Sequence, residues 1–359
     1  MLKVCIIFLL STMLAHAKPT LEEMISQMIV IGFEGQKEGD KWVEQIAKDI
    51  KRQKIGGVFL HEKNIQNPLQ LKKLTHYLSS NAPQSLPLMV IAQDEGGEET
   101  LLHPKKGFSA LPSAQALAKY SDIDEAEKWY DKRAEELYQS GITINLAPVL
   151  DLQPKNSVPI ERRYSSHEEM VTTYAMLFIN ALKTHHVMPV VKYFPTAGAN
   201  LTDHFTSQVD VTPSWQFEQL KPYYDLISVG HVEGVLMSHV WHKELDQKNP
   251  ALFSSLIIGE LLRGKMHFEG LVFVDNLRTD SIAPSIDFKT RIIRSIQAGV
   301  DVLIFPNYFA DNASAPFTVS KIITDAVRLG EISKERIALS YERIEKHKHK
   351  TLKRQSHVD

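Results

Sequence analysis

The chain has 359 residues, of which 41 are lysine or arginine and 43 are aspartate or glutamate, giving a formal net charge of −2. This balance argues against a nucleic-acid-binding protein, because such proteins carry a clear basic excess. Hydrophobic residues make up 43% of the sequence, enough for a sizeable core, and the single cysteine, Cys5, allows no disulfide framework.

The first 17 residues have the features of a cleavable secretory signal. Lys3 precedes an apolar run from Val4 to Leu14, and Ala15-His-Ala17 supplies small residues for cleavage. The run is far shorter than the ~20 residues that span a bilayer, and no other segment is predicted to do so. We therefore expect an exported protein, located in a bacterial periplasm. The expected domains are a signal peptide (1–17), a barrel (18–345) and a basic C-terminal tail (346–359).

Short apolar runs rich in β-branched residues alternate with amphipathic stretches of helical period. This alternation predicts a single-domain (β/α)8 TIM-type barrel, with a doubly wound parallel sheet as the alternative. The barrel is favoured because a polar cluster follows nearly every predicted strand, as at the active face of such barrels. The predicted strands are Met28–Ile31, Gly57–Leu60, Leu88–Ala92, Ile142–Leu146, Met188–Val191, Val235–Ser238, Leu271–Val274 and Val302–Phe305. The predicted helices are Lys41–Lys54, Leu69–Ser80, Asp122–Ser140, His167–His185, Ser255–Gly264 and Lys289–Ala298.

A metal-dependent hydrolase is one alternative, because polar residues follow three successive predicted strands. These residues are Lys192, His239 and Asp275. That interpretation fails at the first predicted strand, where no His-x-His pair appears. The adjacent His185 and His186 also lack partner ligands at a known spacing. We therefore expect no metal.

Short motifs lie within or next to most of the predicted strands. They include Gln27-Met-Ile-Val-Ile-Gly-Phe-Glu-Gly35, Ile55–Leu60, Glu95-Gly-Gly97, Ala147–Asp151, Met237-Ser-His239, Gly270–Asp275 and Ala298-Gly-Val-Asp301. In this order they resemble the signatures of family 3 glycoside hydrolases, in particular single-barrel bacterial β-N-acetylglucosaminidases that act on peptidoglycan fragments. The resemblance runs from about residue 20 to about residue 345.

The resemblance implies that Asp275 is the catalytic nucleophile. A retaining glycosidase uses one carboxylate to attack the anomeric carbon and a second group to protonate the leaving oxygen. Asp275 ends the seventh predicted strand, where the family carries its nucleophile. The alternative role for this aspartate is to cap the segment that follows.

The acid/base of such relatives is an Asp-x-His pair on the loop after the fifth strand. Here Asp203 stands at the aspartate position, Phe205 stands at the histidine position, and His204 lies between them. We predict that His204 transfers the proton and that Asp203 orients it, because an imidazole titrates near neutral pH. The alternative is a solvated loop histidine.

The resemblance also implies sugar contacts by Arg163, Lys192 and His239. Asp94 is predicted to bind sugar hydroxyls, although it lies one position later than the aspartate of the relatives. Asp151 is expected to hold the mouth of the barrel together.

Together these expectations favour an exported glycosidase that releases terminal β-linked N-acetylglucosamine from peptidoglycan-type glycans by a retaining mechanism. Its substrate would be a glycan or muropeptide, and the chemistry needs no cofactor. The alternative is a catalytically impaired barrel that serves as a glycan-binding or scaffold protein of the cell envelope. In that case an envelope partner would bind through the barrel face or the basic tail.

Overall fold

The structure is a computed structural model that describes residues 18–154, 160–198, 209–278, 285–306 and 315–355. The predicted signal peptide and the predicted acid/base pair, Asp203 and His204, lie outside these residues. Within the described part of the chain, no helix is both long enough and apolar enough to cross a lipid bilayer.

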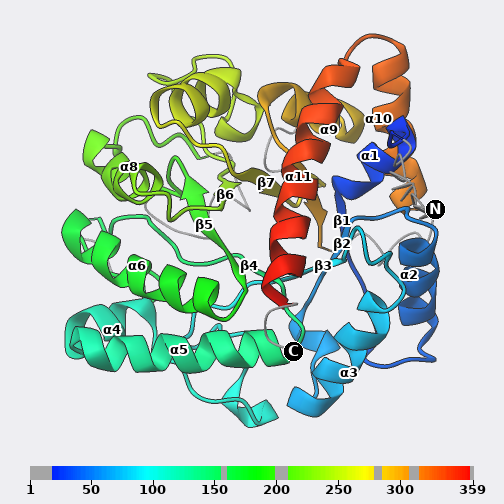
Figure 1. The fold of residues 1–359 in the computed structure, drawn as a ribbon. Coiled ribbons are helices and arrows are strands. Elements are labelled where there is room, and N and C mark those ends of the chain that lie inside the picture. The colour runs from blue at the N-terminus through cyan, green and yellow to red at the C-terminus, as the bar shows by residue number, and fades with distance from the viewer. Residues whose placement is uncertain (1–17, 155–159, 199–208, 279–284, 307–314, 356–359) are drawn as a thin grey trace, which may run out of the picture.

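Eight parallel strands close into a barrel in the order of the sequence (Figure 1). The last strand pairs with the first, with Ile304 opposite Val30, so the sheet has no free edge. This closure confirms the predicted TIM-type barrel, and the doubly wound alternative is wrong because such a sheet stays open. The strands are β1 (Ile29–Gly32), β2 (Gly57–Phe59), β3 (Met89–Ala92), β4 (Ile144–Asn145), β5 (Met188–Phe194), β6 (Gly234–Met237), β7 (Leu271–Asp275) and β8 (Val302–Phe305).

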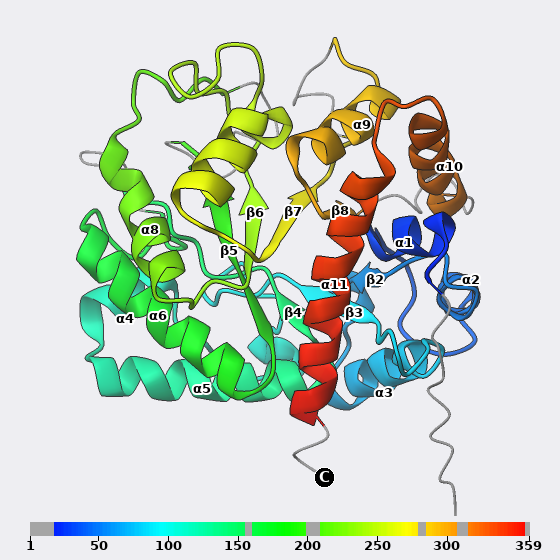
Figure 2. The same cartoon turned by 45° about the horizontal axis from the view of Figure 1, so that its top comes forward.

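Helices surround the barrel (Figure 2), and several begin at a residue that caps the first turn. Asn67 accepts a hydrogen bond of 2.9 Å from Gln70 N, and Asp122 accepts one of 2.8 Å from Glu125 N. The helices are α1 (Leu21–Gln27), α2 (Lys41–Lys51), α3 (Pro68–Ser79), α4 (Ala114–Tyr120), α5 (Ile123–Gln139), α6 (Glu168–Thr184), α8 (Lys221–Ser228), α9 (Phe288–Ala298), α10 (Ala315–Arg328) and α11 (Lys334–Gln355). Short 3-10 helices are η1 (Glu62–Asn64), η2 (Pro104–Lys106), η3 (Phe217–Leu220) and η4 (Ala251–Phe253), and η5 (Leu256–Lys265) is a π-helix.

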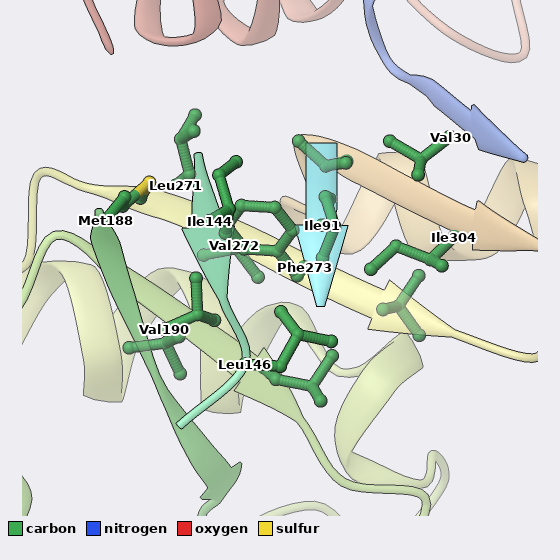
Figure 3. Packing of buried hydrophobic residues seen from close by; sticks show 14 of the residues in the cluster. Val30, Ile91, Ile144, Leu146, Met188, Val190, Leu271, Val272, Phe273 and Ile304 are labelled. Atoms are coloured by element: carbon green, nitrogen blue, oxygen red, sulfur yellow. The ribbon is translucent and has the colours of Figure 1, made fainter. Parts of the chain in front are cut away.

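Apolar side chains of neighbouring strands pack against one another in the barrel (Figure 3). Val30, Val190 and Phe273 are among those with no exposed surface. At Gly234 a methyl group would lie 2.8 Å from Val190 Cγ2 and 2.9 Å from Met188 Cε, so glycine is needed for this close approach. Burial of each large apolar side chain stabilises the fold by roughly 1.5–3 kcal/mol, which fits a protein without a disulfide framework.

Helix α11 lies across the end of the barrel where the strands begin (Figures 1 and 2). Lys348 Nζ donates to Gln27 Oε1 at 2.6 Å and to Gly56 O at 2.9 Å, just before β1 and β2. Lys350 forms an ion pair with Glu233, the residue before β6. The tail predicted to begin at residue 346 thus continues α11, and its Lys348 is buried against the barrel.

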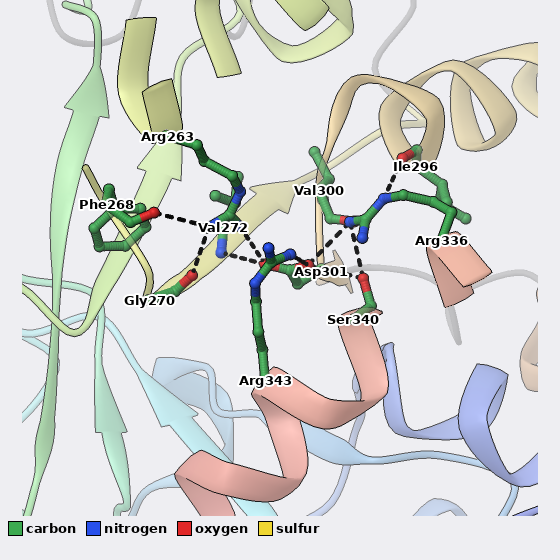
Figure 4. Close-up of polar contacts among 10 residues, drawn as sticks. All are labelled: Arg263, Phe268, Gly270, Val272, Ile296, Val300, Asp301, Arg336, Ser340 and Arg343. Carbon is green, nitrogen blue, oxygen red and sulfur yellow. Dashed lines mark hydrogen bonds and ion pairs between the residues drawn. The ribbon is translucent and has the colours of Figure 1, made fainter. Parts of the chain in front are cut away.

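The buried carboxylate of Asp301, the residue before β8, anchors α11 and η5 to the barrel (Figure 4). Val272 N donates to its Oδ2 at 3.1 Å and ties it to β7. Guanidinium groups from η5 and α11 surround the carboxylate, and these are Arg263 at 2.7 Å, Arg336 at 2.9 Å and Arg343 at 3.1 Å. One carboxylate therefore joins a strand, the π-helix and the last helix.

We predict that Asp301→Asn lowers the free energy of unfolding by about 3–5 kcal/mol, because it leaves the surrounding guanidinium groups without their anion. Denaturant unfolding of the wild type and the variant measures this loss. Asp325→Asn is the matched control, since Asp325 is 29% exposed and pairs with Lys321 and Arg328 on α10. The control should cost less than about 1 kcal/mol, and equal losses in the two variants would contradict the prediction.

Candidate active site

Polar side chains gather at the end of the barrel where the strands finish, opposite α11. Lys192 lies near the end of β5, and Asp275 is the last residue of β7. Glu95 and His239 lie three residues after β3 and two residues after β6, respectively. In a TIM barrel this end forms the active face, so closure of the sheet brings together residues that are far apart in the sequence.

Asp275 presents a carboxylate that is 13% exposed. The next residue, Asn276, has a φ of 51°, a left-handed conformation that asparagine tolerates better than most residues, and it turns the chain as the strand ends. His239 Nε2 donates to the carbonyl oxygen of Asp275 at 3.1 Å and lies 3.6 Å from its Oδ1. Among the described residues, Oδ1 accepts no hydrogen bond. This oxygen is buried, so it is a polar atom that still needs a hydrogen-bond donor.

Glu95 binds two cationic side chains. Arg162 donates to both of its carboxylate oxygens, from Nε to Oε2 and from Nη2 to Oε1, each at 2.8 Å. Lys192 forms an ion pair with Oε1 of the same carboxylate. Arg162 also donates to the hydroxyl of Tyr193 at 3.1 Å. Because a bidentate guanidinium–carboxylate pair has a defined geometry, this buried cluster fixes the orientation of each member.

An irregularity in β5 brings two consecutive side chains to this cluster. Between Lys192 and Phe194 the register of β5 shifts by one residue against β6. Consecutive side chains of a regular strand point to opposite faces, but a bulge re-aims them. Lys192 and Tyr193 therefore both reach the ion pair formed by Glu95 and Arg162.

Burial and charge shift the pKa values of the site in different directions. Burial raises the pKa of Glu95, but the charges of Arg162 and Lys192 outweigh it and bring the pKa to about 2. Burial lowers the pKa of Lys192 to about 8, although Glu95 opposes this shift. Burial raises the pKa of Asp275 against the opposing charges of His239 and Lys192. Near neutral pH, Glu95 is ionised and Lys192 is mostly charged.

The structure places Arg163 outside the cluster that its neighbour Arg162 enters. The Arg163 guanidinium donates to Gly198 O and lies 4.0 Å from Asp151. Asp151 also accepts a hydrogen bond of 2.7 Å from Ala197 N, as expected for a residue that holds the mouth of the barrel together. Arg163 thus supports the loop after β5, and Arg162 is the arginine beside Lys192.

Asp94 is buried within the loop that follows β3. Its Oδ2 accepts hydrogen bonds from Thr100 Oγ1 at 2.9 Å, from Leu102 N at 2.7 Å and from Arg133 at 3.2 Å. The next residue, Glu95, is the acidic group that meets Lys192. Asp94 Oδ1 is also buried and has no hydrogen-bond partner among the described residues, and the predicted contact of Asp94 with sugar hydroxyls stays a prediction.

Sequence reasoning missed Glu95, Arg162 and Tyr193 as members of the site. The sequence signal for two of them was that Arg162 and Glu95 are immediate neighbours of the predicted residues Arg163 and Asp94. Only the fold shows which member of each pair enters the cluster. Asp203 and His204 lie outside the described residues, so their predicted role stays a prediction. The described residues contain no group of three or more His, Cys, Asp or Glu that could hold a metal ion.

We predict that Glu95→Gln lowers the free energy of unfolding at pH 7 by about 3–5 kcal/mol, because two buried cations lose their shared anion. The pKa of Glu95 is lowered on folding, so its stabilisation is present at pH 7 and is lost as the pH falls toward about 2. The difference between wild type and variant should therefore shrink in acid, as measured by denaturant unfolding across pH.

Glu99→Gln is the matched control for this prediction. Glu99 lies 3.7 Å from Arg162 but is 69% exposed, so its loss should cost less than about 1 kcal/mol. A Glu95→Gln protein as stable as the control would show that the cluster does not support the fold.

Comparison with known proteins places the chain in a family. Residues 20–346 match the family described as "Glycosyl hydrolase family 3 N terminal domain". A beta-hexosaminidase of Tolumonas auensis is 30% identical over 263 residues, which cover 72% of this chain and 77% of the relative.

Solved structures agree with this placement. A glycoside hydrolase family 3 beta-N-acetylglucosaminidase from Paenibacillus sp. str. FPU-7 superposes with a TM-score of 0.81 at 27% identity, covering 93% of this chain. This chain spans 63% of that protein. A beta-N-acetylhexosaminidase from Beutenbergia cavernae is covered over its full length, with a TM-score of 0.79, and at 22% identity it supports the fold alone. The predicted resemblance is confirmed, and this chain belongs to glycosyl hydrolase family 3.

Proposed function

We propose that this protein is an exported β-N-acetylhexosaminidase that releases terminal N-acetylglucosamine from peptidoglycan-type glycans with retention of configuration. The observation that carries the proposal is the carboxylate of Asp275, which ends β7 with an oxygen that accepts no hydrogen bond from the described residues. The names of the family relatives support the sugar, and the signal-like segment at 1–17 supports export.

In the proposed reaction, Asp275 attacks the anomeric carbon of the sugar. As the new carbon–oxygen bond forms, the bond to the leaving oxygen breaks, and that oxygen takes a proton from the imidazolium of His204. The same imidazole then removes a proton from water, which attacks the anomeric carbon and releases Asp275. Asp203 orients the ring, and no cofactor takes part.

The charge at the mouth of the barrel suits a neutral sugar. Arg162 and Lys192 are cations, and Glu95 and Asp275 are acidic, so the four groups balance when all are ionised. A sugar carrying its own carboxylate would upset this balance, whereas an N-acetylhexosamine would not. The ammonium of Lys192 and the guanidinium of Arg162 can each donate to sugar hydroxyls.

A catalytically impaired, glycan-binding barrel is the second candidate. The observation in its favour is Phe205, which stands where the resemblance places the acid/base histidine. In addition, Glu95 already binds both Arg162 and Lys192, so a sugar would have to share these donors. This candidate predicts binding of muropeptides without turnover.

The deciding experiment assays the mature protein with an aryl N-acetyl-β-glucosaminide. We expect turnover that Asp275→Ala reduces to background and that Asp131→Asn, a change at an exposed carboxylate on α5, leaves intact. Because the nucleophile must be ionised and burial raises the pKa of Asp275, the acidic limb of the kcat/KM profile should lie at a higher pH than for an ordinary aspartate. Absence of turnover, with muropeptide binding that survives Asp275→Ala, would reject the enzyme. Proton NMR of the first product should show the β anomer.

We also predict that His204→Ala lowers kcat by roughly 10²- to 10⁴-fold, the usual effect of removing a general acid/base. The decrease in kcat should be smaller for a substrate with an activated aryl leaving group, because such a group needs less protonation to depart. His349→Ala, a change at a half-exposed residue of α11, is the control. If kcat is equal for the His204 variant and the control, the proton donor lies elsewhere.

A further inference from the structure

A hollow of about 670 Å³ lies at the end of the barrel opposite the candidate active site. Its walls come from α3, the segment 82–89, the end of α5 and α11. Met89, the first residue of β3, and Thr143, the residue before β4, form part of its floor. The volume is within the ~300–1,000 Å³ range of small-molecule sites.

Basic side chains line this hollow, and none of its lining residues is acidic. Lys72 and His76 come from α3, and His347 and Lys348 come from α11. The stretch from residue 68 to residue 93, which supplies most of one wall, contains no aspartate or glutamate at all. A cavity with this lining has a positive potential that no carboxylate of its own wall offsets.

The hollow on the other side of α11 provides an internal comparison. It measures about 620 Å³, and its lining mixes both signs of charge. Its acidic residues are Glu233, Glu269 and Glu342, and its basic residues include Arg343, Lys346 and Lys350. The charge imbalance is therefore a property of the first hollow and not of α11 as a whole.

Lys348 is the strongest indication that this hollow binds an anion. Its side chain is 2% exposed, and its ammonium donates to two neutral acceptors, Gln27 Oε1 and Gly56 O. An ammonium has three donors, so one remains without an acceptor among the described residues. Neither Lys348 nor Lys72 forms an ion pair in the described part of the chain. Burial lowers the pKa of Lys348 to about 7, which reflects the cost of a buried charge without a counter-ion.

We propose that this hollow binds a compact oxyanion of the phosphate class, held between the buried ammonium of Lys348 and the exposed Lys72 and His76 of α3. The anion would supply the missing counter-charge for Lys348, and the apolar surface of Pro87 and Leu88 would contact a carbon skeleton attached to it. The proposal is independent of the glycosidase activity, since the two sites lie at opposite ends of the barrel.

Isothermal titration calorimetry of the mature protein with sodium phosphate tests the proposal, at an ionic strength kept constant with sodium chloride. We expect saturable binding of one phosphate per chain. Glycerol 3-phosphate should bind through the same site, whereas neutral glycerol should not bind there. Absence of saturable phosphate binding, or equal binding of neutral glycerol, would overturn the proposal.

Variants locate the binding. The double change Lys72→Ala and His76→Ala affects exposed residues of α3 and should weaken phosphate binding by about tenfold or more, because charge-assisted hydrogen bonds are lost. Lys348→Met should abolish it, and thermal unfolding of this variant checks that α11 still packs on the barrel. Lys346→Ala, which changes the hollow on the other side of α11, is the matched control. Phosphate binding that is as strong in the double variant as in the control would reject this site.

Discussion

The end of the barrel where the strands begin depends on the buried carboxylate of Asp301. It binds the backbone of β7 and the guanidinium groups of η5 and α11, segments that no strand pairing holds in place. The strands themselves are short, and β4 has only two residues. Long ladders therefore contribute little, and the helices that cover the barrel must be held by their own contacts. A charged group is an effective anchor here because losing either partner leaves an uncompensated buried charge.

A buried carboxylate with several cationic partners is also present at the mouth of the barrel, but its consequence there is different. Glu95 gathers Arg162 and Lys192, so both cations have a carboxylate partner before any ligand arrives. Asp275 is consequently left without a direct ion pair to either cation, and burial keeps its pKa raised. A carboxylate that is buried, has few hydrogen bonds and lies close to a donor such as His239 supports the nucleophilic role that we propose for Asp275. The ion pairs at Glu95 thus leave Asp275 without a cation bound directly to its carboxylate.

The barrel could be predicted from the sequence, but the arrangement of the side chains at its mouth could not. Strand positions followed from runs of buried β-branched residues, and Lys192, His239 and Asp275 followed from their places at strand ends. By contrast, Arg162 and Arg163 are adjacent, and no periodicity tells which of two loop neighbours turns inward. The same holds for Asp94 and Glu95. Tyr193 was missed because a regular strand would point it away from Lys192, and the bulge that reverses this arises from pairing with β6.

The two ends of the barrel differ in how completely their charges are matched. At the mouth, the acidic groups Glu95 and Asp275 balance Arg162 and Lys192, which suits a neutral sugar that competes through hydroxyl groups. At the opposite end, Lys348 is nearly as deeply buried as Lys192 but has only neutral acceptors. A buried ammonium is tolerated in a fold when its hydrogen bonds or a counter-ion offset the loss of hydration. Lys192 meets this condition within the chain, whereas Lys348 meets it only in part. This difference is why we assign a neutral ligand to the mouth and an anionic one to the base.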